Sequence, residues 1–358
     1  MHTVLIGAGG TGGHVFPGIA VADELVRRDA RTRVVFAGTA RGLETRLVPR
    51  AGYALELLPI LPLNGVGAAR MLMGLLALPW GLLKSALVVL RLRPAAVLGI
   101  GGYAGGPVTL IAALIGIRAV ILEPNARPGF TNRVLKPFVD AAACAYEEAR
   151  ASFGAKGVLT GNPVRGGFAS LPAKPHREPL TLLAFGGSQG SRVLNQALVA
   201  ALPRLPGPER LRIVHQTGPA MRDEVEAGYR AASRPAEVVA FLDDMERRLG
   251  EADLVLARSG ATTCAELTVA GRAALLVPFA GAADDHQTTN ARALEAAGAA
   301  RVPEERDLSG ESLAEALSRL VERPAALTAM DEAARRLGKK DAAARVADLL
   351  LGPGGARA

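Results

Sequence analysis

Cysteine and aromatic residues are scarce in this sequence of 358 residues. Its two cysteines, Cys144 and Cys264, lie far apart and outside any metal-ligand spacing. This excludes a disulfide framework and is typical of small buried residues in a reducing compartment. Aromatic residues make up only 4% of the chain, so its core must be built from Leu, Val, Ile and Ala. A signal-peptide pattern is also missing, because a β-strand is expected directly from Thr3.

Acidic residues are scarce in the first half of the chain. Residues 1–162 contain 17 Lys and Arg against 9 Asp and Glu, whereas residues 163–358 contain 25 of each. The net charge of +8 therefore lies entirely in the N-terminal half, and an arginine-rich composition alone does not explain this asymmetry. We expect the first half to meet something anionic, such as a phosphorylated ligand, a membrane surface or nucleic acid.

Short apolar runs alternate with helical patterns along both halves. Strands are predicted at residues 3–7, 33–37, 54–58, 95–99, 119–122 and 141–145, and again at 180–185, 211–215, 237–240, 254–257 and 274–277. In the first half, helices are predicted at residues 15–28, 41–50, 70–92 and 106–115. This alternation predicts an α/β protein with two Rossmann-like, doubly wound domains, which bind ligands at the carboxyl ends of their strands.

The domain boundary is expected near residues 161–179, which contain four prolines and no clean periodicity. We therefore predict one domain over residues 1–162 and a second over residues 163–335, with a cleft between their sheets. The remaining residues, 336–358, are expected to include a helix that returns to the first domain.

Residues 71–90 form an apolar run that approaches the length of a membrane span. Pro79, Lys84 and the position of the run between two predicted strands argue against a crossing. Two interpretations remain: a buried crossover helix, or a helix face that dips into an anionic membrane interface. Trp80, the only tryptophan, and the flanking basic residues suit the second, and both interpretations stay open.

Three glycine-rich turns follow predicted strands, at residues 7–14, 99–106 and 186–190. Small residues let the backbone approach an anion, which the N–H groups at a helix start attract. A tight turn explains any one of them, but three together favour binding of diphosphate groups. The first has the Gly-x-Gly-x-x-Gly form of a dinucleotide site. However, the second predicted strand ends Phe36-Ala37-Gly38-Thr39, without the acidic residue that a nicotinamide cofactor requires.

Two side chains beside these turns suit a reaction. His14 follows the first turn and is either an exposed residue at a helix start or a general base, since a helix N-terminus favours the neutral ring. Glu266 lies near another predicted helix start without a basic partner three or four residues away. Its carboxylate is suited to accept hydrogen bonds from a ribose diol.

Seven motifs, in this order, resemble those of the MurG glycosyltransferases and span nearly the whole chain. They are Gly9–Gly18, Gly101–Pro107, Gly161–Arg165, Gly186–Gly190, Phe241–Met245, Arg258–Thr263 and Asp285–Asn290. The resemblance implies the two-lobed, B-type glycosyltransferase fold. It also implies transfer of N-acetylglucosamine from UDP-N-acetylglucosamine to the 4-hydroxyl of the muramoyl sugar in undecaprenyl-diphospho-muramoyl-pentapeptide (lipid I). The product would be lipid II, a precursor of peptidoglycan, formed by direct displacement that inverts the anomeric centre.

The resemblance also implies roles for individual residues. His14 would be the catalytic base, with Glu123 as the alternative, and Gly102 and Tyr103 would contact the acceptor. The donor would be bound by Thr11, Gly12, Gly13, Asn125, Arg165, Ser188, Leu242, Ala261, Thr262, Thr263, Cys264, Ala265, Glu266, Gln287 and Asn290. No metal is obligatory in this scheme, and stimulation by Mg²⁺ is left open. One position departs from the family pattern, because Leu122 stands where many members have a histidine, and this shifts weight onto His14.

Three other functions compete with this one. A B-type transferase that uses a different lipid acceptor is the nearest alternative. An NAD-dependent oxidoreductase is disfavoured by the missing acidic residue after the second strand. A non-catalytic membrane or nucleic-acid binder is disfavoured because aromatic and basic residues do not interleave. We therefore expect a peripheral enzyme at the cytoplasmic face of the cell membrane, with an anionic membrane surface but no nucleic acid among its partners.

Overall fold

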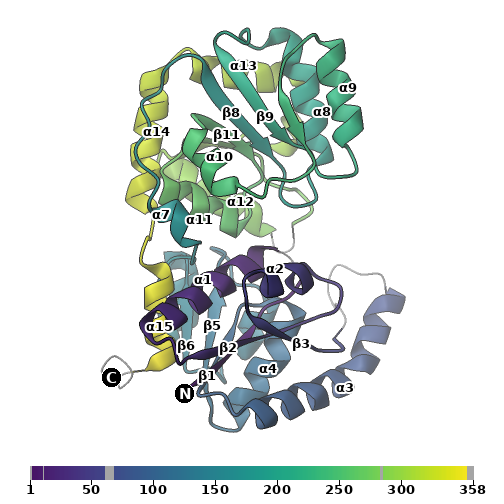
Figure 1. Ribbon diagram of the computed structural model, residues 1–358, viewed down its shortest axis with the longest axis vertical. Helices are drawn as coiled ribbons and strands as arrows, with labels where there is room; N and C mark the ends of the chain where they lie inside the picture. The colour runs from purple at the N-terminus through teal and green to yellow at the C-terminus, as the bar shows by residue number, and fades with distance from the viewer. Residues whose placement is uncertain (1, 11, 61–67, 283–284, 353–358) are drawn as a thin grey trace. The chain divides into compact units, whose positions relative to one another are not determined.

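The computed structural model describes residues 2–10, 12–60, 68–282 and 285–352. The chain forms two compact units, each built around its own sheet (Figure 1). Unit 1 comprises Met1–Arg165 together with Lys339–Ala358, and unit 2 comprises Gly166–Gly338. The chain thus passes into unit 2 after Arg165, against an expected boundary at residue 162, and re-enters unit 1 at Lys339, against an expected residue 336.

Unit 1 contains a parallel seven-stranded sheet with the order β3-β2-β1-β4-β5-β6-β7. Its strands are β1 (Thr3–Gly7), β2 (Arg33–Gly38), β3 (Ala54–Leu57), β4 (Ala96–Gly99), β5 (Arg118–Glu123), β6 (Ala141–Cys144) and β7 (Gly157–Leu159). The first six were predicted from their apolar runs. The three residues of β7 are too few to show such a run, and this strand was missed.

Helices cover both faces of the unit 1 sheet. They are α1 (Gly12–Arg28), α2 (Glu44–Arg50), α3 (Ala68–Leu92), α4 (Gly102–Leu114), α5 (Phe130–Leu135), α6 (Glu147–Phe153) and α15 (Ala342–Leu351). Because side chains alternate along a strand, Val4 and Ile6 pack with α1 and α15 on one face, while Leu5 packs with α3 and α4 on the other. The helix α15 is fastened to α1 by Arg28, whose Nη1 lies 2.6 Å from Asp348 Oδ1.

Unit 2 contains a parallel six-stranded sheet with the order β10-β9-β8-β11-β12-β13. Its strands are β8 (Leu180–Phe185), β9 (Leu211–Gln216), β10 (Glu237–Val239), β11 (Leu254–Ala257), β12 (Ala274–Leu276) and β13 (Ala300–Arg301). Its helices are α7 (Gly166–Ala169), α8 (Arg192–Ala201), α9 (Arg222–Ala231), α10 (Met245–Glu251), α11 (Ala261–Ala270), α12 (His286–Ala296), α13 (Gly310–Val321) and α14 (Pro324–Leu337). The large core between the sheet and α8, α9 and α13 is built mainly from Leu, Val and Ala. The predicted fold of two doubly wound parallel sheets is confirmed.

Both sheets reverse their strand order once, between β1 and β4 in unit 1 and between β8 and β11 in unit 2. Doubly wound sheets bind ligands outside the carboxyl ends of the strands at such a point. Three of the loops at the two reversal points are the glycine-rich turns after β1, β4 and β8, and the fourth is Arg258-Ser259-Gly260 after β11. The topology therefore places one candidate site on each unit.

Two helices begin earlier than the sequence predicted. The helix α1 starts at Gly12 and α4 starts at Gly102, inside the first and second glycine-rich turns. Glycine has a low helix propensity, so a pattern of side chains does not reveal helical turns that glycine itself opens. As a result, the turns are shorter than expected and helix N–H groups lie closer to β1 and β4.

The helix α3 carries apolar side chains on two sides. Val88 and Val89 face the sheet and are buried. A second set is exposed and recurs at steps of three and four residues: Met73, Leu76, Trp80, Leu83, Leu87 and Leu90. Simple burial of a crossover helix therefore accounts for only one side of α3. Among the described residues, none of the helices has the length and apolar content needed to cross a membrane.

Candidate active site

The first two glycine-rich turns approach each other closely at the carboxyl ends of β1 and β4. A Cβ at Gly102 would lie 3.0 Å from Gly9 O, and one at Gly10 would lie 3.6 Å from Tyr103 Oη. Gly10, Gly101 and Gly102 have φ angles of 96°, 69° and 65°, which residues with a side chain rarely adopt. Glycine therefore lets these two backbone segments meet and places Gly102 and Tyr103 beside the first turn.

His14 lies at this junction, in the first turn of α1. Its Nδ1 is 3.2 Å from Gly9 O, and a Cβ at Gly101 would lie 3.7 Å from Nε2. A carbonyl oxygen only accepts hydrogen bonds, so this contact is a donation from Nδ1–H. The tautomer with Nδ1–H carries its basic lone pair on Nε2, beside the second turn. This geometry suits a general base.

Glu123 ends β5 as a buried carboxylate that organises the loop after it. Its Oε1 accepts hydrogen bonds from the backbone N and the Nδ2 of Asn125, at 3.0 and 3.2 Å. Its Oε2 accepts from Gly129 N and Asn132 Nδ2, both at 2.9 Å. Burial raises the pKa of Glu123, and these donors act in the opposite direction. Four donors occupy the lone pairs of this carboxylate, which favours His14 over Glu123 as the base.

Asn132 was not singled out from the sequence, yet it links Glu123 to the glycine-rich junction. A Cβ at Gly101 would lie 3.9 Å from Asn132 Nδ2, which also donates to Leu122 O at 2.9 Å. The side chain of Leu122 is fully buried in the core of unit 1. The position at which the resemblance implied a histidine in many members is thus an aliphatic core residue in this chain.

The remaining unit 1 positions surround the start of α1. Gly12 and Gly13 are its first two residues, whereas Thr11 lies outside the described residues. The guanidinium of Arg165 stacks over the ring of Phe16, 4.7 Å from its centroid. A cation from the end of the Gly161–Arg165 motif therefore lies at the amino end of α1, on the same unit as His14.

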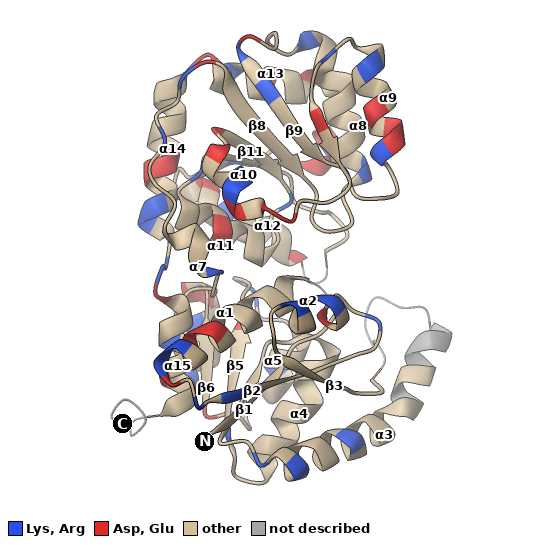
Figure 2. Cartoon of the chain, viewed as in Figure 1, with Lys and Arg blue, Asp and Glu red and all other residues tan. Residues whose placement is uncertain are grey.

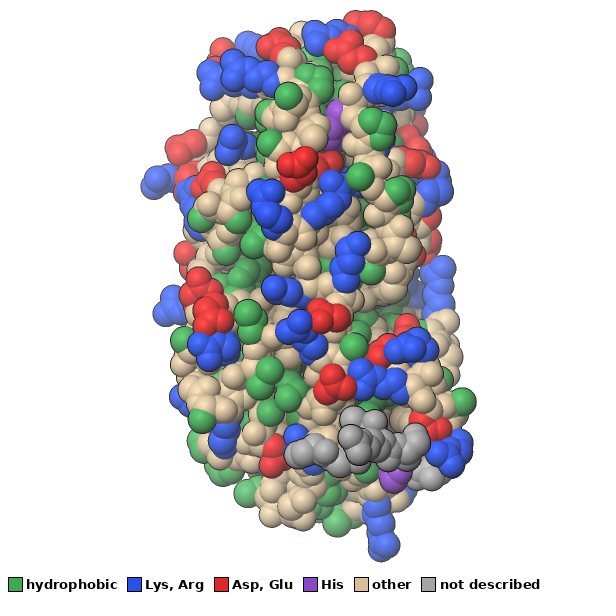
Figure 3. All heavy atoms as spheres, turned by 90° about the vertical axis from the view of Figure 1, so that its left-hand side faces the viewer, with side chains coloured by type: hydrophobic (Ala, Val, Ile, Leu, Met, Phe, Trp, Pro, Cys, Tyr) green, Lys and Arg blue, Asp and Glu red, His purple; other side chains and the backbone are tan. Residues whose placement is uncertain are grey.

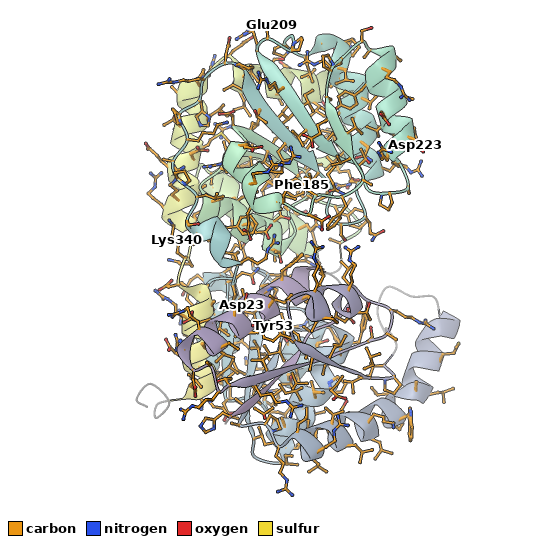
Figure 4. All side chains as sticks on the ribbon, viewed as in Figure 1. Asp23, Tyr53, Phe185, Glu209, Asp223 and Lys340 are labelled. Carbon is orange, nitrogen blue, oxygen red and sulfur yellow. The ribbon has the colours of Figure 1, made fainter. Side chains whose placement is uncertain are left out.

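In unit 2, the third glycine-rich turn leads from β8 into α8. It follows Phe185, the last residue of β8 (Figure 4), and Gly190 N donates to Gly187 O at 2.9 Å. Ser191 caps the helix, since its Oγ accepts from Leu194 N at 3.4 Å. The turn brings half-buried Ser188 next to a helix N-terminus, where backbone N–H groups and the helix dipole attract an anion.

The loop after β11 opens a second helix N-terminus at the same reversal point. Ala261, Thr262 and Thr263 form the first turn of α11 and are half-buried, as is Ala265. Cys264 and Glu266 are buried on the next turn. The residues expected to bind the diphosphate and the carboxylate expected to bind the ribose therefore lie on the same short helix, α11.

Arg258, to which sequence reasoning assigned no role, joins the two unit 2 loops. Its Nε donates to Ser191 Oγ at 3.1 Å, and Nη1 donates to two backbone carbonyls directly after β12. Its Nη2 pairs with Glu305 Oε1 at 2.9 Å, and the guanidinium stacks on Phe279, 5.4 Å from the ring centroid. The sequence did contain an indication of this role, because Arg258 directly follows an apolar strand. A buried guanidinium at such a position needs hydrogen-bond and ion-pair partners.

The start of α12 is held against the end of β11. Ser259 Oγ donates to Gln287 O at 2.9 Å, and Asn290 Nδ2 donates to Ser259 O at 3.4 Å. Gln287 Oε1 accepts from Phe279 N at 3.1 Å. Asn290 is fully buried, which favours a positioning role over contact with a sugar. Leu242, in the segment that connects β10 to α10, is buried as well.

A protein metal site requires several acidic, histidine or cysteine side chains close together. Among the described residues, no group of three or more of them is placed to hold an ion together. The chemistry that the described residues offer is therefore an imidazole on unit 1, and two helix N-termini with a buried carboxylate on unit 2.

Comparison with known proteins agrees with the division of the chain into two units. The glycosyltransferase family 28 N-terminal domain matches residues 4–144, and the family 28 C-terminal domain matches residues 181–346. A protein of Myxococcus xanthus is 47% identical over 98% of this chain and 93% of its own length, and one of Anaeromyxobacter is 48% identical over 97% and 92%. Both are named UDP-N-acetylglucosamine–N-acetylmuramyl-(pentapeptide) pyrophosphoryl-undecaprenol N-acetylglucosamine transferase. The crystal structure of Acinetobacter baumannii MurG is 33% identical, with a TM-score of 0.78, and the match covers 98% of this chain and 99% of that one.

The chain belongs to the MurG family of glycosyltransferases. The resemblance seen in the sequence motifs is thereby confirmed over both units. Each of the two family 28 domains carries one of the two candidate sites.

Proposed function

We propose that this protein transfers N-acetylglucosamine from UDP-N-acetylglucosamine to the 4-hydroxyl of the muramoyl sugar of lipid I, forming lipid II. The names of relatives that are 47 and 48% identical over nearly the full chain carry this proposal. In it, UDP binds unit 2, where Ser188 and the first turn of α11 receive the diphosphate and Glu266 receives the ribose. The observation that supports this placement is the meeting of two helix N-termini at one strand reversal.

The acceptor binds unit 1 in this proposal. His14 Nε2 takes the proton of the 4-hydroxyl as its oxygen attacks the anomeric carbon, and the bond from that carbon to the UDP oxygen breaks. The Nδ1–H contact with Gly9 O supports this role because it leaves the basic lone pair on Nε2. We propose that N–H groups of α8 and α11 stabilise the charge on departing UDP, so that no metal is obligatory.

A direct assay tests this proposal. The purified chain is mixed with UDP-N-acetylglucosamine and a soluble analogue of lipid I, and UDP and the disaccharide are measured in parallel, with and without EDTA. We expect stoichiometric release of both products under either condition. UDP release with a different lipid-linked acceptor, but none with the muramoyl analogue, would favour the alternative transferase. Binding of NADH without any transfer would overturn the glycosyltransferase proposal.

We also propose that the exposed side of α3 contacts an anionic membrane at the cytoplasmic face, where the lipid acceptor resides. Its apolar residues recur at helical spacing, and Lys84 Nζ lies over the Trp80 ring, 5.1 Å from the centroid. The neighbouring helix α4 ends at Leu114, which is exposed, as is Ile115 directly after it. An aromatic and aliphatic stripe bordered by cations suits a lipid interface.

The distribution of charge also supports the exposed side of α3 as the membrane-binding surface. Unit 1 contains 22 Lys and Arg against 11 Asp and Glu, whereas unit 2 contains 20 against 23. The helix α3 carries basic but no acidic residues (Figure 2). Over α14 and α15, in contrast, basic and acidic side chains are interspersed (Figure 3). A membrane of negative charge would therefore favour the α3 side of unit 1 over the α15 side.

We expect the combined substitutions Leu76→Glu, Trp80→Glu and Leu83→Glu to abolish binding to vesicles that contain anionic phospholipid. Each removes an exposed apolar side chain worth about 1.5–3 kcal/mol when buried, and each adds a repelled charge. Co-sedimentation measures binding, and activity on the soluble acceptor should persist because these side chains point away from the core. Val158→Glu, at an exposed apolar position on β7, is the matched control and should bind normally. Undiminished binding by the triple variant would contradict the proposed surface.

A further inference from the structure

Glu44 is a buried carboxylate beneath the first glycine-rich turn. It stands in the first turn of α2, and its side chain is inaccessible to solvent. Its Oε1 accepts hydrogen bonds from Thr39 N at 2.8 Å and Thr39 Oγ1 at 2.9 Å, and its Oε2 accepts from Gly10 N at 3.0 Å. Glu44 therefore ties the loops that follow β1 and β2 to one helix start.

The surroundings of Glu44 are built to admit this carboxylate. A Cβ at Gly42 would lie 1.9 Å from Glu44 Oε2, one at Gly38 would lie 2.6 Å from Glu44 Cγ, and one at Gly9 would lie 3.0 Å from Oε1. Among the described residues, no Lys or Arg forms an ion pair with it. A buried acidic group held only by N–H and O–H donors is costly for folding, which calls for a reason beyond stability.

The reason lies in the peptide group between Gly9 and Gly10. Its N–H donates to Glu44 Oε2, while its carbonyl accepts the proton of His14 Nδ1 at 3.2 Å. One amide therefore connects the carboxylate to the imidazole. Hydrogen bonds in such a chain polarise one another, so a carboxylate at the N–H end strengthens the carbonyl as an acceptor. A stronger acceptor at Gly9 O favours the Nδ1–H tautomer and stabilises the imidazolium that forms when Nε2 gains a proton.

We infer that Glu44 is a positioning residue for His14, acting through the Gly9–Gly10 peptide. The carboxylate holds this peptide in one orientation, with Gly10 at a φ of 96°, and the peptide in turn holds the imidazole. The catalytic consequence rests on the proposed function, whereas the geometry of the relay does not. Two separate measurements therefore distinguish the two.

The first measurement reads the tautomer of His14 by nitrogen NMR of the full chain labelled at its histidine rings. His14→Gln identifies the signals among the five histidines. In the wild type we expect the Nδ1–H form, and Glu44→Gln should increase the Nε2–H form, since an amide replaces the carboxylate that polarises the peptide. A wild-type His14 in the Nε2–H form would overturn the inference, even if Glu44→Gln failed to fold.

The second measurement is steady-state kinetics of Glu44→Gln with the soluble acceptor. We expect kcat to fall about 10- to 100-fold, the loss of one charge-assisted hydrogen bond, with little change in KM. Thr39→Val is the matched control: it removes one donor to the same carboxylate but retains the link to Gly10. It should lower thermal stability while keeping the tautomer and kcat.

The outcomes separate the hypotheses. If Glu44→Gln folds and changes neither tautomer nor kcat, Glu44 has only a structural role. If the tautomer shifts as expected while the wild type transfers no sugar, the relay stands and the proposed function fails.

Discussion

Replacement of His14 by Gln is expected to lower kcat for sugar transfer by about 10²–10⁴-fold, the contribution of a positioned general base. The contact of Nδ1 with Gly9 O, at 3.2 Å, supports the direction of the effect, because a ring that donates from Nδ1–H carries its basic lone pair on Nε2. Most of the side chains expected to bind UDP-N-acetylglucosamine, Ser188 and Glu266 among them, lie on unit 2, and His14 was not assigned to donor binding. Donor affinity should therefore change little, and the loss should appear in kcat.

Steady-state kinetics with the soluble acceptor and calorimetric titration of UDP test this prediction. His2→Gln provides the matched control, because that imidazole is exposed ahead of β1 and should be dispensable. A near-normal kcat in His14→Gln would remove His14 as the base. If Glu123→Gln were then folded but inactive, the carboxylate would take over that role, despite the four donors that it holds.

Most of the strands, and the loops that form the candidate sites, were predictable because they depend on local signals. Apolar runs followed by glycine-rich turns predicted β1, β4 and β8. Because these strands lie where the strand order reverses, the three turns lie at the candidate sites. The order of the seven motifs along the chain predicted the family, and the comparisons confirm that prediction. Short strands such as β7 and β13 gave no such signal.

The side chains that support the site were not predictable, because their partners are distant in the sequence or are backbone atoms. Glu44 looks like an ordinary acidic residue at a helix start until the chain folds Gly10 onto it, 34 residues away. Asn132 and Arg258 likewise gain their meaning from contacts with other loops. On α3, apolar residues occur on two sides, and only the packed sheet reveals that Val88 is buried while Leu87 is exposed.

Raising the pH from about 6 to about 9.5 is expected to destabilise unit 2 through His176. This imidazole is buried between two carboxylates: Nδ1 is 2.9 Å from Asp253 Oδ1, and Nε2 is 3.2 Å from Asp331 Oδ2. Burial lowers the pKa of His176, but the two carboxylates outweigh it and raise the pKa from 6.5 to about 9. Lys174 also pairs with Asp253, and Arg335 lies 3.8 Å from Asp331.

The direction follows from the two protonation states. Below about pH 6.5 both the folded and the unfolded chain hold the proton, and the ion pairs contribute fully to the free energy of unfolding. As the pH rises towards about 9, only the folded protein retains the proton, so this contribution of about 3 kcal/mol is progressively lost. His176→Gln should therefore be less stable than the wild type at low pH, and the difference should shrink as the pH rises.

Urea unfolding followed by circular dichroism across this pH range measures the difference between the two proteins. His215→Gln is the matched control, because burial lowers the pKa of His215 to about 4, so that above about pH 7.5 its ring is neutral in both the folded and the unfolded chain. Its stability should therefore retain the alkaline slope of the wild type. Parallel curves for the wild type and His176→Gln would mean that His176 is not the group that titrates, and that the two carboxylates are held chiefly by Lys174, Arg335 and backbone N–H groups.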